Sequence, residues 1–147
     1  MNDHDFLFTA EKIDHRLQLI ERALFQKSRA LAPWRYRKVD ASSQINDELW
    51  SQTDSWALIE PHSYWGEWQT NFCLSTELVI PSDWPDSHCL QLYLPMGEAG
   101  DFFSHPEMLL TINGECIGSA DRHHHVVQLP TDLPKDKRLT VHAVGWT

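Results

Sequence analysis

Hydrophobic side chains recur at every second position through the C-terminal half of the chain, and this alternation restricts the fold more than any other feature. In the segment NFCLSTELVI, the even-numbered residues from Phe72 to Ile80 fall on one side of an extended strand. Pro81 and Ser82 then break the pattern. Further alternating segments follow, namely CLQLYL, MLLTI, ECIGS, HVVQL and RLTVHAV. The alternation predicts a series of short β-strands.

The strongest local signal for strand pairing is the dipeptide Asn113-Gly114, which lies between MLLTI and ECIGS. Asparagine and glycine tolerate the positive φ angles of a two-residue hairpin turn. Short strands that are separated by turns, with no helix between them, are typical of an antiparallel β-sandwich or jelly roll. We therefore expect a mostly β fold of this class.

The segment after Thr9 has the period of an amphipathic helix instead. Its apolar stripe recurs at i, i+4, i+7 and i+11 and consists of Ile13, Leu17, Ile20 and Leu24. We expect this single N-terminal amphipathic α-helix to run to about Ala30. The stripe must be covered, either by the body of the same domain or by a neighbouring domain, and the sequence leaves both alternatives open.

Pro33 ends the helical pattern, and the charged segment that follows, WRYRKVDASSQINDELWSQTD, shows no period. We therefore assign residues 1–50 to the N-terminal helix and a connector, and residues 51–147 to the β-sandwich domain. A length of 147 residues suits one structural unit with one core.

Charge and cysteine content exclude several classes of partner and compartment. Twenty-one acidic against twelve basic residues give a formal net charge of −9, which disfavours nucleic acid and anionic membranes. We expect a neutral or a protein partner. The three cysteines are widely spaced and the N-terminus has no signal-peptide pattern, so we expect reduced thiols and a cytoplasmic protein.

Three consecutive histidines, His123, His124 and His125, interrupt the predicted strands. Two of them, His123 and His125, are spaced so that both imidazoles can point to one side of a strand and bind a metal. A third ligand would have to come from Asp121, His105 or Glu107, and no spacing in the sequence brings them together. The alternative is a solvated loop, so we predict neither a metal site nor a cofactor in this chain.

Catalytic signatures are absent from the sequence. It contains no nucleophile elbow, no phosphate-binding glycine-rich loop and no His-Glu-x-x-His helix. Acidic pairs could serve glycoside hydrolysis, but pairs arise by chance among 21 acids. We therefore predict no catalytic residue. The segment SYWGEWQ offers a different interpretation, in which Trp65 and Trp68 stack on sugar rings, although most tryptophans fill cores.

Several motifs, taken in their order and spacing, resemble a known family. They occur in VIPSDWP, in the hairpin with the histidines and in the closing LTVHAVG, and comprise Trp65-Gly66, Ile80-Pro81 with Trp84, Asn113-Gly114-Glu115, and Asp121-Arg122 with His124. Over roughly residues 8 to 147 the chain is similar to the N-terminal β-sandwich domain of the α-mannosidases of glycoside hydrolase family 38, of the cytosolic and bacterial type.

This resemblance implies a galactose-binding-like sandwich attached to a larger enzyme. In that family, zinc-assisted hydrolysis of α-mannosides uses ligands and a nucleophilic aspartate from a following catalytic domain, and no segment of this chain matches them. The chain also departs from the family at Cys73-Leu74-Ser75, where Trp-Phe-Arg is frequent. We expect a fragment that is inert by itself, with the parent catalytic domain as its partner and zinc only in that domain.

The resemblance also suggests roles for two surfaces. The loop Asp121, Arg122, His123, His124 and His125 would meet the catalytic domain at the rim of its cleft, with Asp121 orienting His124. The apolar stripe would dock on the same enzyme, and in the isolated chain it would promote self-association. Two other hypotheses are a free-standing carbohydrate-binding module that uses Trp65 and Trp68, and a small metalloprotein built on His123 and His125.

Overall fold

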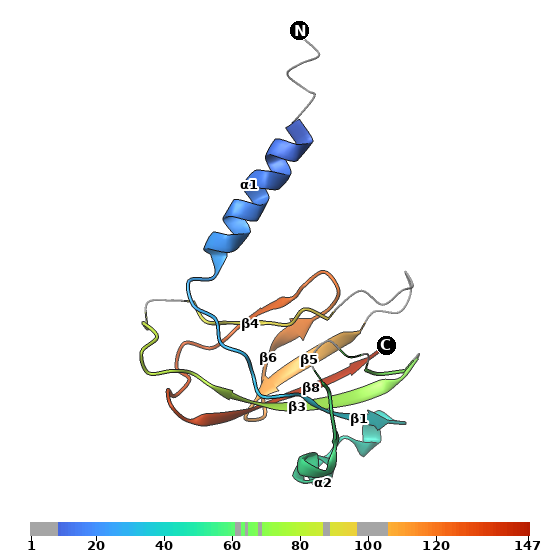
Figure 1. Ribbon diagram of the computed structural model, residues 1–147. Helices are drawn as coiled ribbons and strands as arrows, with labels where there is room; N and C mark the ends of the chain where they lie inside the picture. The colour runs from blue at the N-terminus through green and yellow to red at the C-terminus, as the bar shows by residue number, and fades with distance from the viewer. Residues whose placement is uncertain (1–8, 61–62, 64, 68, 87–88, 97–105) are drawn as a thin grey trace. The chain divides into compact units, whose positions relative to one another are not determined.

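The computed structural model describes residues 9–60, 63, 65–67, 69–86, 89–96 and 106–147 (Figure 1). The chain divides into two compact units, residues 1–30 and residues 31–147. The described part of the first unit contains one helix. All the strands that the structure describes lie in the second unit.

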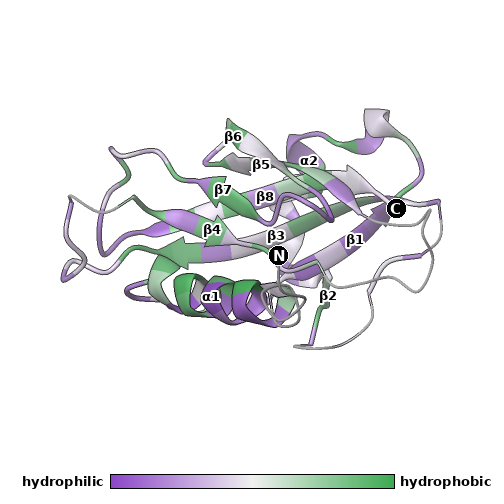
Figure 2. Cartoon of the chain, turned by 90° about the horizontal axis from the view of Figure 1, so that it is seen from above, coloured by the Kyte–Doolittle hydropathy of each residue, from purple (hydrophilic) through white to green (hydrophobic). Residues whose placement is uncertain are grey.

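Helix α1 (Thr9–Leu24) has 16 residues, which confirms the predicted N-terminal helix. Glu11 in its first turn and Arg22 in its last turn complement the helix dipole. Apolar and polar residues alternate along the helix, as Figure 2 shows by colour. The helix ends earlier than predicted, because residues 25–30 add no member to the apolar stripe. The side chains of the stripe are exposed, with exposed fractions of 51% for Ile13, 56% for Leu17, 57% for Ile20 and 64% for Leu24.

The second unit is built from two antiparallel sheets, so the predicted mostly β fold is confirmed. The six-stranded sheet has the order β2-β1-β3-β8-β5-β6. Its strands are β1 (Arg35–Val39), β2 (Ala57–Leu58), β3 (Asn71–Val79), β5 (Glu107–Ile112), β6 (Glu115–Ala120) and β8 (Arg138–Trp146). The two-stranded sheet pairs β4 (Gln91–Tyr93) with β7 (Val126–Gln128).

The main core lies between the two sheets, as the period of two predicted. The even-numbered residues of β3 and the odd-numbered residues of β8 point inward, and Phe72, Leu110 and Val141 are fully buried. Leu92 and Val127 close the core from the two-stranded sheet. The one polar group on the inner side of β3, Thr76, donates its hydroxyl to the carbonyl oxygen of Ala32 at 2.7 Å, so its burial costs little.

The hairpin between β5 and β6 turns at Asn113 and Gly114, as predicted. Their φ angles are +49° and +88°, which is the left-handed region that these two residues tolerate best. The Oδ1 atom of Asn113 also accepts a hydrogen bond from the Thr140 amide at 3.1 Å, which ties the turn to β8.

The segment that was predicted to be a connector contains regular secondary structure. Strand β1 pairs with β3 through five residues, although its own sequence, RYRKV, has no hydrophobic period. Two short 3-10 helices and helix α2 (Asp47–Ser51) follow, and Asn46 caps α2 by accepting the Leu49 amide at 2.9 Å. They cover the outer face of the six-stranded sheet with a small second core of Val39, Leu49, Trp56 and Cys73.

Candidate functional site

The loop between β6 and β7 is organised around the carboxylate of Asp121. Its Oδ1 atom accepts hydrogen bonds from the backbone amides of His123 at 2.6 Å and His124 at 2.8 Å. Aspartate commonly closes turns in this way, because its short side chain reaches amides two and three residues ahead. The carboxylate also meets the imidazole of His124, with 2.8 Å between Oδ2 and Nδ1. The structure therefore brings together the pair that the resemblance suggested.

Electrostatics strengthen this arrangement. The hydrogen bond from the His124 side chain, followed by the backbone amides, lowers the pKa of Asp121 to about 2. Because the carboxylate faces Nδ1, that nitrogen carries a proton and Nε2 is left for other contacts. The His124 side chain is 75% exposed. The loop thus presents one oriented imidazole to its surroundings, and this ring can form a hydrogen bond with a partner.

His125 is held differently from His124. Its Nε2 atom donates to the carbonyl oxygen of Arg122, and its ring meets the edge of Tyr93 with 6.4 Å between centroids. Its carbonyl accepts the amide of Leu94 at 2.7 Å, which joins the loop to β4. His125 therefore helps to hold the loop in place.

The residues considered as metal ligands do not form a ligand set within the described part of the chain. No group of three or more histidine, cysteine, aspartate or glutamate side chains is close enough there to hold a metal ion. His105 lies outside the described residues. Glu107 stands on β5, opposite Trp146 of β8. The described residues therefore form no fitting site for a zinc ion.

Of the two tryptophans considered for sugar stacking, Trp65 is partly buried against the main core. Its ring meets Phe72 edge to face with 5.1 Å between centroids, and Tyr36 at 6.0 Å. Trp68 lies outside the described residues. Contacts with the core thus occupy much of the Trp65 ring.

Two aromatic features on the outer face of the six-stranded sheet were not predicted. His142 stacks on Trp50, with 4.0 Å between ring centroids and 9° between planes, and burial lowers the pKa of this histidine. Trp146 is 50% exposed at the end of β8. The signal for both was present in the sequence, because they alternate with the inward residues Leu139, Val141 and Ala143.

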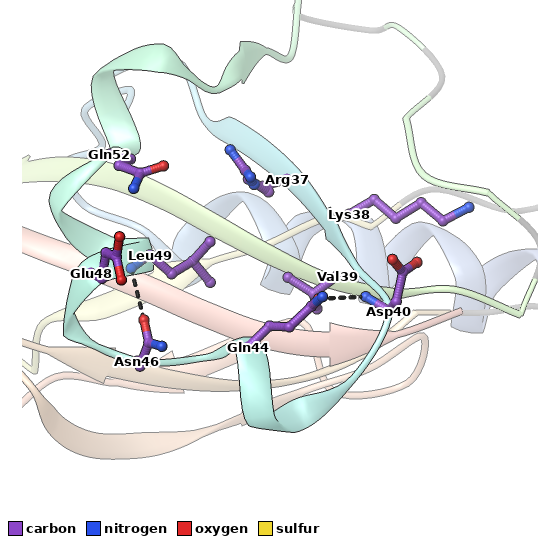
Figure 3. A pocket seen from close by; sticks show the side chains of 9 residues that line it. All are labelled: Arg37, Lys38, Val39, Asp40, Gln44, Asn46, Glu48, Leu49 and Gln52. Carbon is purple, nitrogen blue, oxygen red and sulfur yellow. Dashed lines mark hydrogen bonds between the residues drawn. The ribbon is translucent and has the colours of Figure 1, made fainter.

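A pocket lies where β1 meets α2 (Figure 3). Several of its polar groups stabilise local structure. The Oε1 atom of Gln44 accepts the Asp40 amide at 2.8 Å, Asn46 caps α2, and Lys38 pairs with Glu67 at 2.5 Å. The lining is completed by Arg37, Val39, Glu48, Leu49 and Gln52. The pocket is lined by side chains that connect neighbouring elements of the fold, so the loop at Asp121 remains the better candidate site.

Comparison with known proteins adds no assignment. No model of a known protein family matches the chain, and no curated protein matches it either. None of the helices in the described ranges is long and apolar enough to cross a membrane.

Acid is expected to release the Asp121 loop. The pKa of about 2 in the folded chain lies below the ordinary value of 3.8, so the carboxylate stabilises the loop fully above pH 3.8 and loses this effect as the pH falls through 2. In an NMR titration, the amide signals of His123 and His124 should shift with a midpoint near 2. Asp121→Asn should remove this step, while the amide of Gly114 reports whether the sheet stays folded. A midpoint near 3.8 would contradict the prediction.

Proposed function

We propose that this chain is the non-catalytic N-terminal accessory domain of a family 38 α-mannosidase, an enzyme that hydrolyses α-mannosides. In this proposal the domain packs on the catalytic domain and helps to shape its cleft. The observation that carries the proposal is the loop itself, because Asp121 holds it in one conformation while His124 stays 75% exposed. The order of the family motifs and the mostly β fold with an N-terminal helix also support it.

The physical argument for a docking role is preorganisation. Ordering a loop on binding costs free energy, and a loop that its own hydrogen bonds already order avoids much of that cost. The second surface in the proposal is the apolar stripe of α1, each of whose members is more than half exposed. Apolar surface of this kind is typical of protein contacts. The two surfaces belong to different units of the chain, and each would contribute one contact with the neighbouring domain.

The chemistry belongs, in this proposal, to the partner domain. Retaining glycoside hydrolysis needs a nucleophilic carboxylate, and the family adds a zinc ion. The carboxylate of the candidate site, Asp121, already makes three hydrogen bonds within its own loop. The role of this chain would be to position His124 at the interface.

The isolated chain is expected to show no α-mannosidase turnover. The reason is that the sequence has no segment matching the family's nucleophile and metal ligands. The measurement is hydrolysis of an aryl α-mannoside with and without added zinc, compared with buffer. Turnover that survives a second, independent purification would contradict the accessory role.

The decisive experiment is to determine the coding sequence that follows the codon for Thr147. The proposal expects an open frame that continues into a His-x-His-x-Asp-like zinc motif. That catalytic region can then be produced separately and mixed with this chain on a gel-filtration column. His124→Ala and Leu17→Asp should each weaken the complex, whereas the exposed Lys137→Ala should not. A frame without such a motif, or two proteins that elute independently, would refute the proposal.

A further inference from the structure

Trp146 is presented on the outer face of the six-stranded sheet by a strand that cannot easily move. Strand β8 lies between β3 and β5, and it pairs with β3 along its whole length and with β5 from Val141 to Trp146. Beyond Trp146 the ladder continues, since the amides of Thr70 and Thr147 each donate to the other's carbonyl at 3.2 and 3.0 Å. The indole is 50% exposed on this rigid support. Such an aromatic surface is already in place before a ligand arrives.

Polar side chains flank Trp146 on both neighbouring strands. Asn71 of β3 and Glu107 of β5 are its direct partners across the ladders. Residues directly opposite each other have Cβ atoms about 4.5–5.5 Å apart and share one face of the sheet. Both side chains are exposed, and neither makes a hydrogen bond or an ion pair with any residue that the structure describes. We call Asn71, Glu107 and Trp146 the indole platform.

We propose that the indole platform binds a neutral pyranose ring. The indole of Trp146 stacks on the C–H face of the sugar, as aromatic rings do with apolar surface. The carboxamide of Asn71 can donate to and accept from ring hydroxyls, and the carboxylate of Glu107 accepts from them. The platform thus offers one apolar face between two sets of hydrogen-bonding groups, which is the pattern of groups on a pyranose.

The charge of the platform selects among ligands. Glu107 and the formal net charge of −9 oppose phosphates, sulfates and uronic acids. An acyclic polyol has no ring face to stack on the indole. A neutral cyclic sugar meets both requirements. Since one indole and two polar groups form the contact, the affinity should be weak, with a Kd on the order of 1 mM.

This site is separate from the Asp121 loop and does not depend on the proposed accessory role. It also differs from the stacking surface considered from the sequence, because Trp65 packs against Phe72 whereas Trp146 is open to a ligand. The α-mannosidase proposal can fail without affecting the indole platform, and the reverse also holds.

The test is an NMR titration of the ¹⁵N-labelled chain with methyl α-mannopyranoside and methyl α-glucopyranoside, with sorbitol as the acyclic control. The indole N–H signal of Trp146 is assigned by its absence from Trp146→Phe. We expect this signal and the amides of residues 71 and 107 to shift and saturate with at least one pyranoside. Trp146→Ala should weaken binding at least tenfold, on the order of 1.4 kcal/mol.

Three further variants sharpen the test. Trp146→Phe should retain part of the affinity, since phenylalanine still stacks, and Asn71→Ala should lower the affinity by several-fold. The matched control is Tyr93→Ala, which removes another aromatic side chain that is 53% exposed, in the two-stranded sheet, and should leave binding unchanged. The proposal is overturned by an indole signal that stays constant up to about 50 mM sugar, some fifty times the expected Kd. Equal shifts with sorbitol, or equal binding by Trp146→Ala, would also overturn it.

Discussion

Replacing Gly145 by alanine is expected to lower the free energy of unfolding by about 3 kcal/mol, the upper end of the usual cost of overpacking. A Cβ atom at this position would stand 2.2 Å from the carbonyl oxygen of Glu107, 2.6 Å from Cζ of Phe72 and 2.9 Å from Cβ of Met108. The carbonyl belongs to the backbone of β5 and cannot retreat without disturbing the ladder between β5 and β8. Phe72 is fully buried and has little free space to move into.

Urea unfolding followed by circular dichroism measures this effect. Ser119→Ala, at an exposed position of β6, is the matched control and should change stability by less than about 0.5 kcal/mol. A cost of less than about 1 kcal/mol for Gly145→Ala would contradict a close approach of β5 to β8 at this point, since even moderate overpacking costs that much.

Leu17→Asp in α1 is expected to weaken the self-association of the isolated chain. Each residue of the apolar stripe is more than half exposed, so a second copy can cover the stripe and remove it from water. An aspartate in the middle of that contact would bury a charge without a partner. We expect a concentration-dependent dimer in sedimentation equilibrium, weakened roughly tenfold or more by the substitution, which corresponds to about 1.4 kcal/mol.

His15→Asp provides the control for charge and helix propensity. Position 15 lies on the side of α1 opposite the apolar stripe and is exposed, so the same side chain is introduced where no contact is expected. The dimer should survive this change. A chain that sediments as a monomer at every concentration, or a dimer that both variants weaken equally, would show that the stripe does not mediate association.

Local patterns in the sequence were sufficient to predict much of the fold. The alternation from Phe72 to Ile80 predicted which side of β3 is buried, because side chains of a strand point to opposite faces whatever the strand pairs with. Asn113-Gly114 predicted the hairpin, since positive φ angles depend on the residue itself. The apolar stripe predicted α1, because helical periodicity is also a property of residues a few positions apart. Asp121 and His124 were also found together, because they are only three residues apart.

Other elements depend on partners that are distant in sequence. The segment RYRKV has no strand period, and it is extended because β3 offers it a ladder of hydrogen bonds. Contacts with distant residues also decide whether Trp65 or Trp146 is exposed. The fold places Trp65 against Phe72, and it places Trp146 on the opposite face of the sheet between Asn71 and Glu107.

The sequence by itself therefore determined the strands with a hydrophobic period, the hairpin turn, the helix and the loop at Asp121, since each rests on residues within a few positions of one another. Only the tertiary structure decided the six-stranded order, the strand β1 and the indole platform. The physical reason is that cross-strand neighbours are set by the register between strands, and register is a property of two segments that meet only when the chain is folded.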